Sequence, residues 1–223
     1  MENLGPLREL GGTWVGKGFN LISLPAFQNP GGGHQFFRVK LNSTVENLQF
    51  TQIGGPIPNR GSIAGNGSDP DKGQNDLSLF GVSYLQRVSD ATTFSDLHIE
   101  PGVWLHVPAS DIPAQPDTVV RQGSIPHGTS VLAQGKVIPT VQGGPIINPV
   151  DSTPSRIDGK PFPLGYLDPL LNPQPLPPGI KAQYVKNPNQ FLLDSIAGQK
   201  IVKTEVLDIS TVTNPSLAQA GAH

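Results

Sequence analysis

The chain has 223 residues, of which only 14% are charged, and its formal net charge is −2. A nucleic-acid surface needs a basic stripe, so no nucleic-acid partner is expected. The sequence contains no cysteine, which excludes disulfides, thiolate catalysis and cysteine-bound metals. It has no apolar run of about 18 residues and no basic region followed by an apolar core at its start, so we expect no membrane span, no secretory signal and a cytoplasmic location.

Glycine and proline are abundant, with 26 Gly and 24 Pro in the chain. The segments between them are rich in Val, Ile, Leu and Phe, and apolar residues alternate with polar ones. Alternation is typical of half-buried strands, and Gly and Pro mark the turns that join them. We therefore expect one all-β domain over 1–223, an antiparallel up-and-down β-barrel of about 8–10 strands, with a sandwich as the alternative.

In chain order, residues 3–10 predict a short helix before the first strand at 12–22. Two strands, 34–41 and 44–53, are expected around Asn42-Ser43, and a polar loop follows at 54–76. That loop lacks the ligand spacing of a calcium site, so no metal is expected there. The remaining predicted strands are 77–88, 94–108, 118–125, 130–138 and 201–211, the third and fourth of these pairing across Pro126-His127-Gly128.

The stretch 139–186 has a different character, with ten prolines between Pro145 and Pro178. Proline removes ladder donors, so this insertion is not expected to be central strand. Its apolar residues predict that it packs on or over the barrel, and a mobile linker is the alternative. A late helix is predicted at 187–196, with Asn187 as N-cap and Gly198 as its stop, and 212–223 is expected to be a loose tail.

The segment 97–108 concentrates the scarce chemistry of the chain. His98, Glu100, Trp104 and His106 fall on one parity, and a strand sends alternate side chains to one face. A carboxylate beside an imidazole can orient it or raise its pKa. The shared face depends on Pro101-Gly102, because a β-bulge there would move Trp104 and His106 to the other face.

Three segments in order resemble the nitrobindin-type proteins. They are Leu4-Gly5-Pro6-Leu7, Gly12-Thr13-Trp14-Val15-Gly16-Lys17-Gly18 and Leu97-His98-Ile99-Glu100-Pro101-Gly102-Val103-Trp104. Gly12-Thr13-Trp14 is also similar to the opening of lipocalin-like and fatty-acid-binding-protein-like barrels. The resemblance spans roughly 4–135 and implies an antiparallel barrel that in some members holds a b-type haem. Those members ligate iron through a histidine near the C-terminus, where this chain has only His223, so no ligand residue is carried over.

The leading expectation is a binding site for a small, largely apolar ligand in the interior of the barrel. By the resemblance, haem is one candidate for this ligand. Such pockets combine aromatic walls with a few polar groups that fix orientation. Arg121 is a candidate anchor, because its planar fork binds carboxylates. The residues expected to line the site are His98, Glu100, Trp104, Arg121, Tyr84, Phe37 and Trp14.

Two alternatives remain open. In the first, the protein is a cofactor-free isomerase, cyclase or hydratase, with His98, Glu100 and His127 as acid–base residues acting on an apolar substrate. In the second, it is an interaction module whose proline-rich segment docks to a partner. The sequence leaves the oligomeric state open.

Overall fold

The computed structural model describes residues 2–25, 37–61, 73–126, 128–153, 158, 167 and 175–211. The elements are η1 (Glu2–Leu10), β1 (Gly12–Pro25), β2 (Phe37–Gln52), β3 (Ile57–Asn59), β4 (Leu77–Asp90), β5 (Asp96–Val107), β6 (Ser110–Asp111), β7 (Ala114–Gln115), β8 (Thr118–Ile125), β9 (Thr129–Gln142), α2 (Ala182–Lys186), α3 (Asn189–Ile196) and β10 (Lys203–Ser210).

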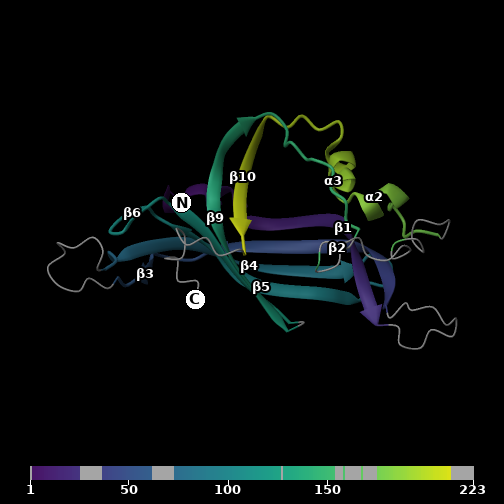
Figure 1. Ribbon diagram of the computed structural model, residues 1–223, viewed down its shortest axis with the longest axis horizontal. Coiled ribbons are helices and arrows are strands. Elements are labelled where there is room, and N and C mark those ends of the chain that lie inside the picture. The colour runs from purple at the N-terminus through teal and green to yellow at the C-terminus, as the bar shows by residue number, and fades with distance from the viewer. Residues whose placement is uncertain are drawn as a thin grey trace.

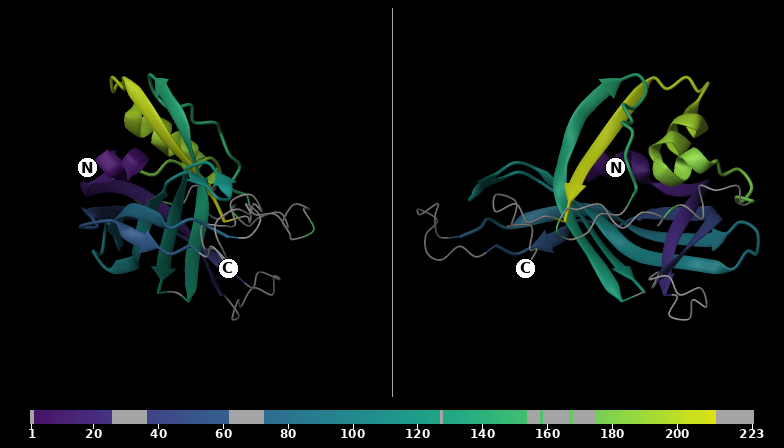
Figure 2. Two further views of the ribbon diagram at one scale, coloured as in Figure 1. Left: turned by 90° about the vertical axis from the view of Figure 1, so that its left-hand side faces the viewer. Right: turned by 45° about the vertical axis from the view of Figure 1, so that its right-hand side comes forward.

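One sheet dominates the molecule, and its strands follow the order β1-β2-β4-β5-β8-β9-β10 (Figure 1). Every pairing along this path is antiparallel, and β3 adds to β4 outside it. The expected antiparallel up-and-down order is thus confirmed. The sheet curls so that β9 and β10 rise away from β1, β2, β4 and β5, as Figure 2 shows from two further sides. Among the described residues β1 and β10 do not pair, so the sheet forms a half-barrel.

Several strand boundaries differ from the prediction. The short strand β3, for example, lies within the segment 54–76 that was expected to be loop, and it pairs with β4. Residues 42 and 43 do not form a turn, because β2 runs unbroken through them and pairs with β1 along its length. The polar side chain of Asn42 is buried there and donates a hydrogen bond to Oδ1 of Asn20 on β1, at 3.1 Å. At the other end of the sheet, β9 continues to Gln142, so the first four residues of the 139–186 insertion belong to a strand.

The strand β5 has no bulge at Pro101-Gly102. Its register with β4 is regular from His106 to His98, and the shift lies beyond His98, opposite Val88 and Ser89. Pairing with β8 begins at Gly102, so Pro101 sits where β5 has no neighbour on that side. A proline has no N–H to donate, so this edge position suits it. His98, Glu100, Trp104 and His106 therefore share one face.

That face is concave and holds the first of two apolar cores. Buried Leu4 and Leu7 of η1 pack against side chains from opposite parts of the curled sheet. Those sheet residues are Phe50, Val82, Tyr84 and Val119, with Leu48, Phe80, Trp104, Val137 and Leu207 partly buried around them. Strands as distant as β2 and β10 contribute to one cluster, which requires the sheet to wrap around it.

The second core joins α2 and α3 to the β1–β2 ribbon. Tyr184 and Val185 of α2 are buried against Leu41, with Phe19 and Phe191 packed around them. The late helix begins two residues after the predicted start, with Pro188 as its N-cap. Asn187, the predicted N-cap, is the C-cap of α2, and its side-chain oxygen accepts a hydrogen bond from the Val150 N–H, not from α3.

The prediction that Gly198 ends the late helix is confirmed. Gly198 follows the C-cap of α3 and has a φ of 79°. The tail 212–223 lies outside the described residues. None of the helices in the described ranges has the length and apolar character that crossing a bilayer requires.

Candidate functional site

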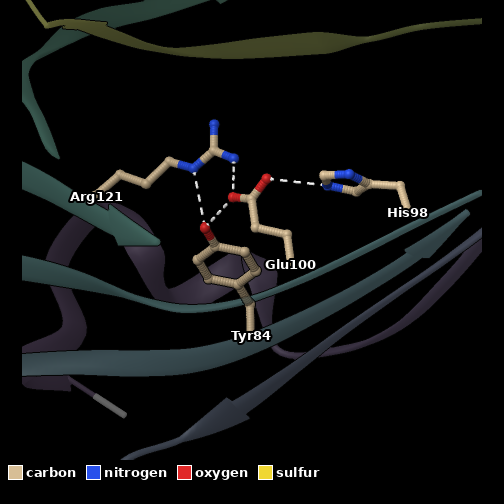
Figure 3. A network of polar contacts seen from close by, with 4 residues as sticks. All are labelled: Tyr84, His98, Glu100 and Arg121. Carbon is tan, nitrogen blue, oxygen red and sulfur yellow. Dashed lines mark hydrogen bonds and ion pairs between the residues drawn. The ribbon is translucent and has the colours of Figure 1, made fainter. Parts of the chain in front are cut away.

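Four polar side chains meet on the concave face (Figure 3). Tyr84 comes from β4, His98 and Glu100 from β5, and Arg121 from β8. The pairing brings them together on one face. Gln86 lies opposite Glu100, Tyr84 lies opposite Gly102, two residues along β5 from Glu100, and Arg121 lies opposite Trp104, four residues along. Neighbouring strands place directly and diagonally opposed side chains within reach of each other.

Glu100 is the centre of this network. Its Oε1 accepts short hydrogen bonds from the Tyr84 hydroxyl and from Nη2 of Arg121, while its Oε2 lies 3.4 Å from Nε2 of His98. The Glu100 side chain is only 5% exposed, against 27% for Arg121 and 23% for His98. A carboxylate is stable at such a depth only when it is paired and hydrogen-bonded, and both conditions are met here.

Arg121 is fixed at three points. Its Nε donates to the Tyr84 hydroxyl at 3.2 Å, its Nη2 donates to Glu100, and its guanidinium carbon lies 5.5 Å from the Tyr84 ring centre and 5.8 Å from that of Trp104. Guanidinium groups are attracted to aromatic faces at such distances. Among the described residues Nη1 of Arg121 has no hydrogen-bond partner, and it is the end of the fork that Figure 3 shows turned away from Glu100.

Two glycines make room for these side chains. A Cβ at Gly123 would lie 2.4 Å from the Tyr84 hydroxyl and 2.9 Å from Oε1 of Glu100. A Cβ at Gly102 would lie 2.2 Å from the Gln122 carbonyl oxygen and 2.5 Å from the Tyr84 ring. Real Cβ atoms do not approach other atoms so closely, so the network requires glycine at both positions. Gly102 and Gly123 are also register partners, and together they form a seam without side chains across β5 and β8.

The network shifts the pKa of its members in opposite directions. Burial alone would raise the pKa of Glu100, but hydrogen bonds from Tyr84, Arg121 and His98 outweigh it and lower that pKa below its ordinary value of 4.5. Burial, reinforced by the carboxylate of Glu100, raises the pKa of Tyr84 above 10.0. Glu100 is therefore an anion and Tyr84 a neutral phenol at neutral pH, and Arg121 remains a cation.

The structure unites five of the predicted site residues: His98, Glu100, Trp104, Arg121 and Tyr84. Trp14 is instead 55% exposed on the edge strand β1, and its indole N–H donates to the Leu10 carbonyl at 2.9 Å. Phe37 begins β2, where it pairs with Pro25, and its side chain lies outside the described part of the structure. His127 also lies outside the described residues, in the turn between β8 and β9.

His106 lies on the concave face, but its contacts are with η1 and Asp117 and not with the Glu100 network. Its Nδ1 lies 3.4 Å from the Asn3 carbonyl, and its Nε2 lies 3.4 Å from Oδ2 of Asp117. Its ring also lies against Gly5, where a Cβ would approach Cε1 of His106 to 2.8 Å. Gly5 has a φ of 52° and a ψ of −127°, a conformation suited to glycine. His106 thus helps to fix η1 on the sheet.

The role of Gly102 and Gly123 in making room for the network was not predicted from the sequence. The available signal was Gly123 itself, which interrupts the strand-like run 118–125 at a position that faces the same side as Arg121. An isolated glycine inside a strand indicates a bulge or the close approach of another group. Here the approaching group is the side chain of Tyr84 from two strands away.

Three hollows among the described residues lie elsewhere. A groove of about 470 Å³ lies between β1 and the helices α2 and α3. A shallow hollow of about 550 Å³ crosses the glycine seam on the opposite face of the sheet, where Val103, Gln122 and Leu132 line it. A third, of about 270 Å³, lies between η1 and the strands β9 and β10. No residue of the Glu100 network lines any of the three.

The chain matches no known family model, no curated protein and no solved structure. The nitrobindin-type resemblance therefore stays an expectation.

The haem that this resemblance implies does not fit the histidines that the structure describes. Nε2 of His98 faces Glu100, Nε2 of His106 faces Asp117, and Nδ1 of His106 faces a carbonyl, so these three ring nitrogens are directed at protein groups. Within the described ranges no three His, Asp or Glu residues gather as a metal site. We derive no role for haem.

Proposed function

We propose that the protein binds a small, largely apolar ligand on the concave face of its half-barrel, with Arg121 as the polar contact. The observation that carries the proposal is the state of Arg121. Its fork is fixed by Tyr84 and Glu100, it lies beside Trp104, and one end has no partner among the described residues while the side chain keeps access to solvent. Binding sites use such fixed polar groups to orient otherwise apolar ligands.

Binding is favoured over acid–base catalysis by the state of Glu100. A general base works best when its pKa lies near the working pH, and the pKa of Glu100 is lowered instead. Its Oε1 is also occupied by two donors. Glu100 therefore acts as a positioning residue, which holds the guanidinium of Arg121 in place.

The chain contains only two tryptophans, so Trp104 can be made the sole reporter. The test titrates the Trp14→Phe protein with 2-bromonaphthalene, whose bromine quenches tryptophan emission on contact. We expect saturable quenching, because Trp104 lines the proposed site.

The matched control is the Trp104→Phe protein, in which the exposed Trp14 remains as the reporter. It should bind the same ligand by equilibrium dialysis without saturable quenching. Absence of binding by the Trp14→Phe protein in dialysis, or equal quenching in the two proteins, would contradict the proposal.

A further inference from the structure

The charge on Arg121 is already balanced. Its Nη2 donates to Glu100, and the Tyr84 hydroxyl beside this ion pair is neutral. On β2, Glu46 faces the same side at the level of His98, two residues along from the level of Glu100, and adds negative charge. The ion pair of Arg121 and Glu100 therefore offers hydrogen-bond donors without a surplus of positive charge.

The unpartnered end of Arg121 can only donate. A guanidinium has no acceptor atom, so the ligand atom that it contacts must be an acceptor. A ligand carboxylate at this point would compete with Glu100 for a single cation and would approach a second carboxylate. Two carboxylates that share one site repel each other, and an anion removed from water without its own counter-charge is costly. A neutral carbonyl oxygen accepts the same hydrogen bond without either cost.

We infer that the ligand class bound at Arg121 is a neutral, apolar carbonyl compound, such as an aryl or alkyl ketone, and not the corresponding carboxylate. The inference rests on the proposed function and deepens it. Glu100 is then the residue that determines specificity, because its negative charge excludes ligand anions. This assignment differs from the expectation from sequence that Arg121 anchors a carboxylate.

The test compares three naphthalenes of nearly equal size and shape. 2-Acetylnaphthalene carries a neutral carbonyl, 2-naphthoate carries a carboxylate, and 2-isopropylnaphthalene carries no acceptor. Their dissociation constants are measured by equilibrium dialysis against the full chain. We expect the wild-type protein to bind the ketone about ten-fold more tightly than either of the others, which is the ratio that one charge-assisted hydrogen bond gives.

Two substitutions separate charge from shape. Glu100→Gln keeps the size of the side chain and removes its negative charge, so the preference should turn toward 2-naphthoate by about ten-fold or more. Arg121→Gln should make the ketone and 2-isopropylnaphthalene bind equally. The matched control is Arg87→Gln, an exposed arginine on the opposite face of β4, which should leave all three constants unchanged.

The outcomes distinguish the inference from the proposed function. Tighter binding of 2-naphthoate than of the ketone by the wild-type protein overturns the inference, and so does equal binding of all three compounds. In both cases the proposed binding site survives, provided that 2-bromonaphthalene still quenches Trp104. If no naphthalene binds, both fail. The wild-type comparison needs no variant, so the test holds even where Glu100→Gln fails to fold.

Discussion

Tyr84, Glu100 and Arg121 form a unit in which each residue supplies what another lacks. Glu100 provides the acceptor that a buried phenol and a guanidinium both need, and these two donors keep the carboxylate ionised. Removing one member leaves the other two buried with unmet hydrogen bonds, which costs more than the bonds themselves contribute. The side chains of this unit are therefore expected to depend on one another.

The stability of the protein should fall at both ends of the pH scale because of this unit. The pKa of Glu100 is lowered in the folded chain, so its contribution is complete above its ordinary value of 4.5 and is lost as pH falls through the folded pKa. The pKa of Tyr84 is raised, so its contribution is complete below 10.0 and is lost as pH rises through the folded pKa.

Urea unfolding followed by circular dichroism at a series of pH values measures both effects. Glu100→Gln should flatten the acidic side of the profile, and Tyr84→Phe should flatten the alkaline side. An unchanged acidic limb in Glu100→Gln would show that other carboxyl groups account for it.

The glycine seam leads to a second prediction at this scale. Gly123→Ala should destabilise the fold by about 2 kcal/mol, because the added methyl group would overlap the Tyr84 hydroxyl and force the network apart. Gly16→Ala is the matched control, since a Cβ there meets no atom within 4 Å, and it should change stability by less than about 1 kcal/mol. Urea unfolding of both variants provides the comparison, and equal stabilities would argue against a tight seam.

At the level of elements, the face on which a side chain lies can be predicted from one strand, whereas the hydrogen bonds between strands cannot. Alternation alone places His98, Glu100 and Trp104 on one face, because the strand itself fixes the direction of each side chain. That Tyr84 and Arg121 join them depends on the register of β4, β5 and β8, which is set by pairing between distant segments. Asn42-Ser43 reads as a turn for the same reason, since the partner that satisfies Asn42 lies 22 residues earlier, on β1.

The two late helices are joined by one carboxylate. Asp194 of α3 accepts hydrogen bonds from Lys181 at 2.7 Å and from Tyr184 at 2.6 Å, and from Gln190 at 2.8 Å. The hydrogen bond from Lys181, with those from Tyr184 and Gln190, holds the pKa of Asp194 far below its usual range. Because Lys181 and Tyr184 lie at and within α2, this carboxylate ties α2 to α3.

Asp194→Ala should therefore raise the exchange rates of the backbone amides in α2 and α3 by several-fold and leave those of β4 and β5 unchanged. Hydrogen exchange read by mass spectrometry or NMR measures this difference. Asp111→Ala, which removes an exposed carboxylate from β6, should leave α2 and α3 unaltered. Faster exchange throughout the sheet would mean that the helices are not a separate unit.

At the scale of the whole molecule, η1 closes one part of the concave face. Leu7 is 0% exposed and packs in a cluster with residues of β2, β4 and β8. The same cluster includes Tyr84, so the apolar core and the polar network are continuous. The N-terminal segment is thus expected to be part of the cooperative fold and not an appendage.

Leu7→Ala should lower the free energy of unfolding by about 3 kcal/mol, as buried leucine truncations commonly do. Leu192→Ala, at an exposed leucine of α3, should lower it by less than about 1 kcal/mol. Urea unfolding measured by both far-UV circular dichroism and tryptophan emission should give coincident transitions. A separate early transition in Leu7→Ala would indicate that η1 unfolds on its own.

The glycine seam also limits how this chain can diverge. A side chain at 123 would occupy the space of the Tyr84 hydroxyl, whereas a Cβ at 102 would lie 2.2 Å from the Gln122 carbonyl oxygen as well as against the Tyr84 ring. Among descendants of a common ancestor, Gly102 should therefore persist whatever stands at 84, and alanine or serine should enter at 123 only in lineages that have replaced the tyrosine by a smaller residue. Coupled substitution at 84 and 123 beside a constant Gly102 is the evolutionary signature by which distant relatives that share this network should be recognised.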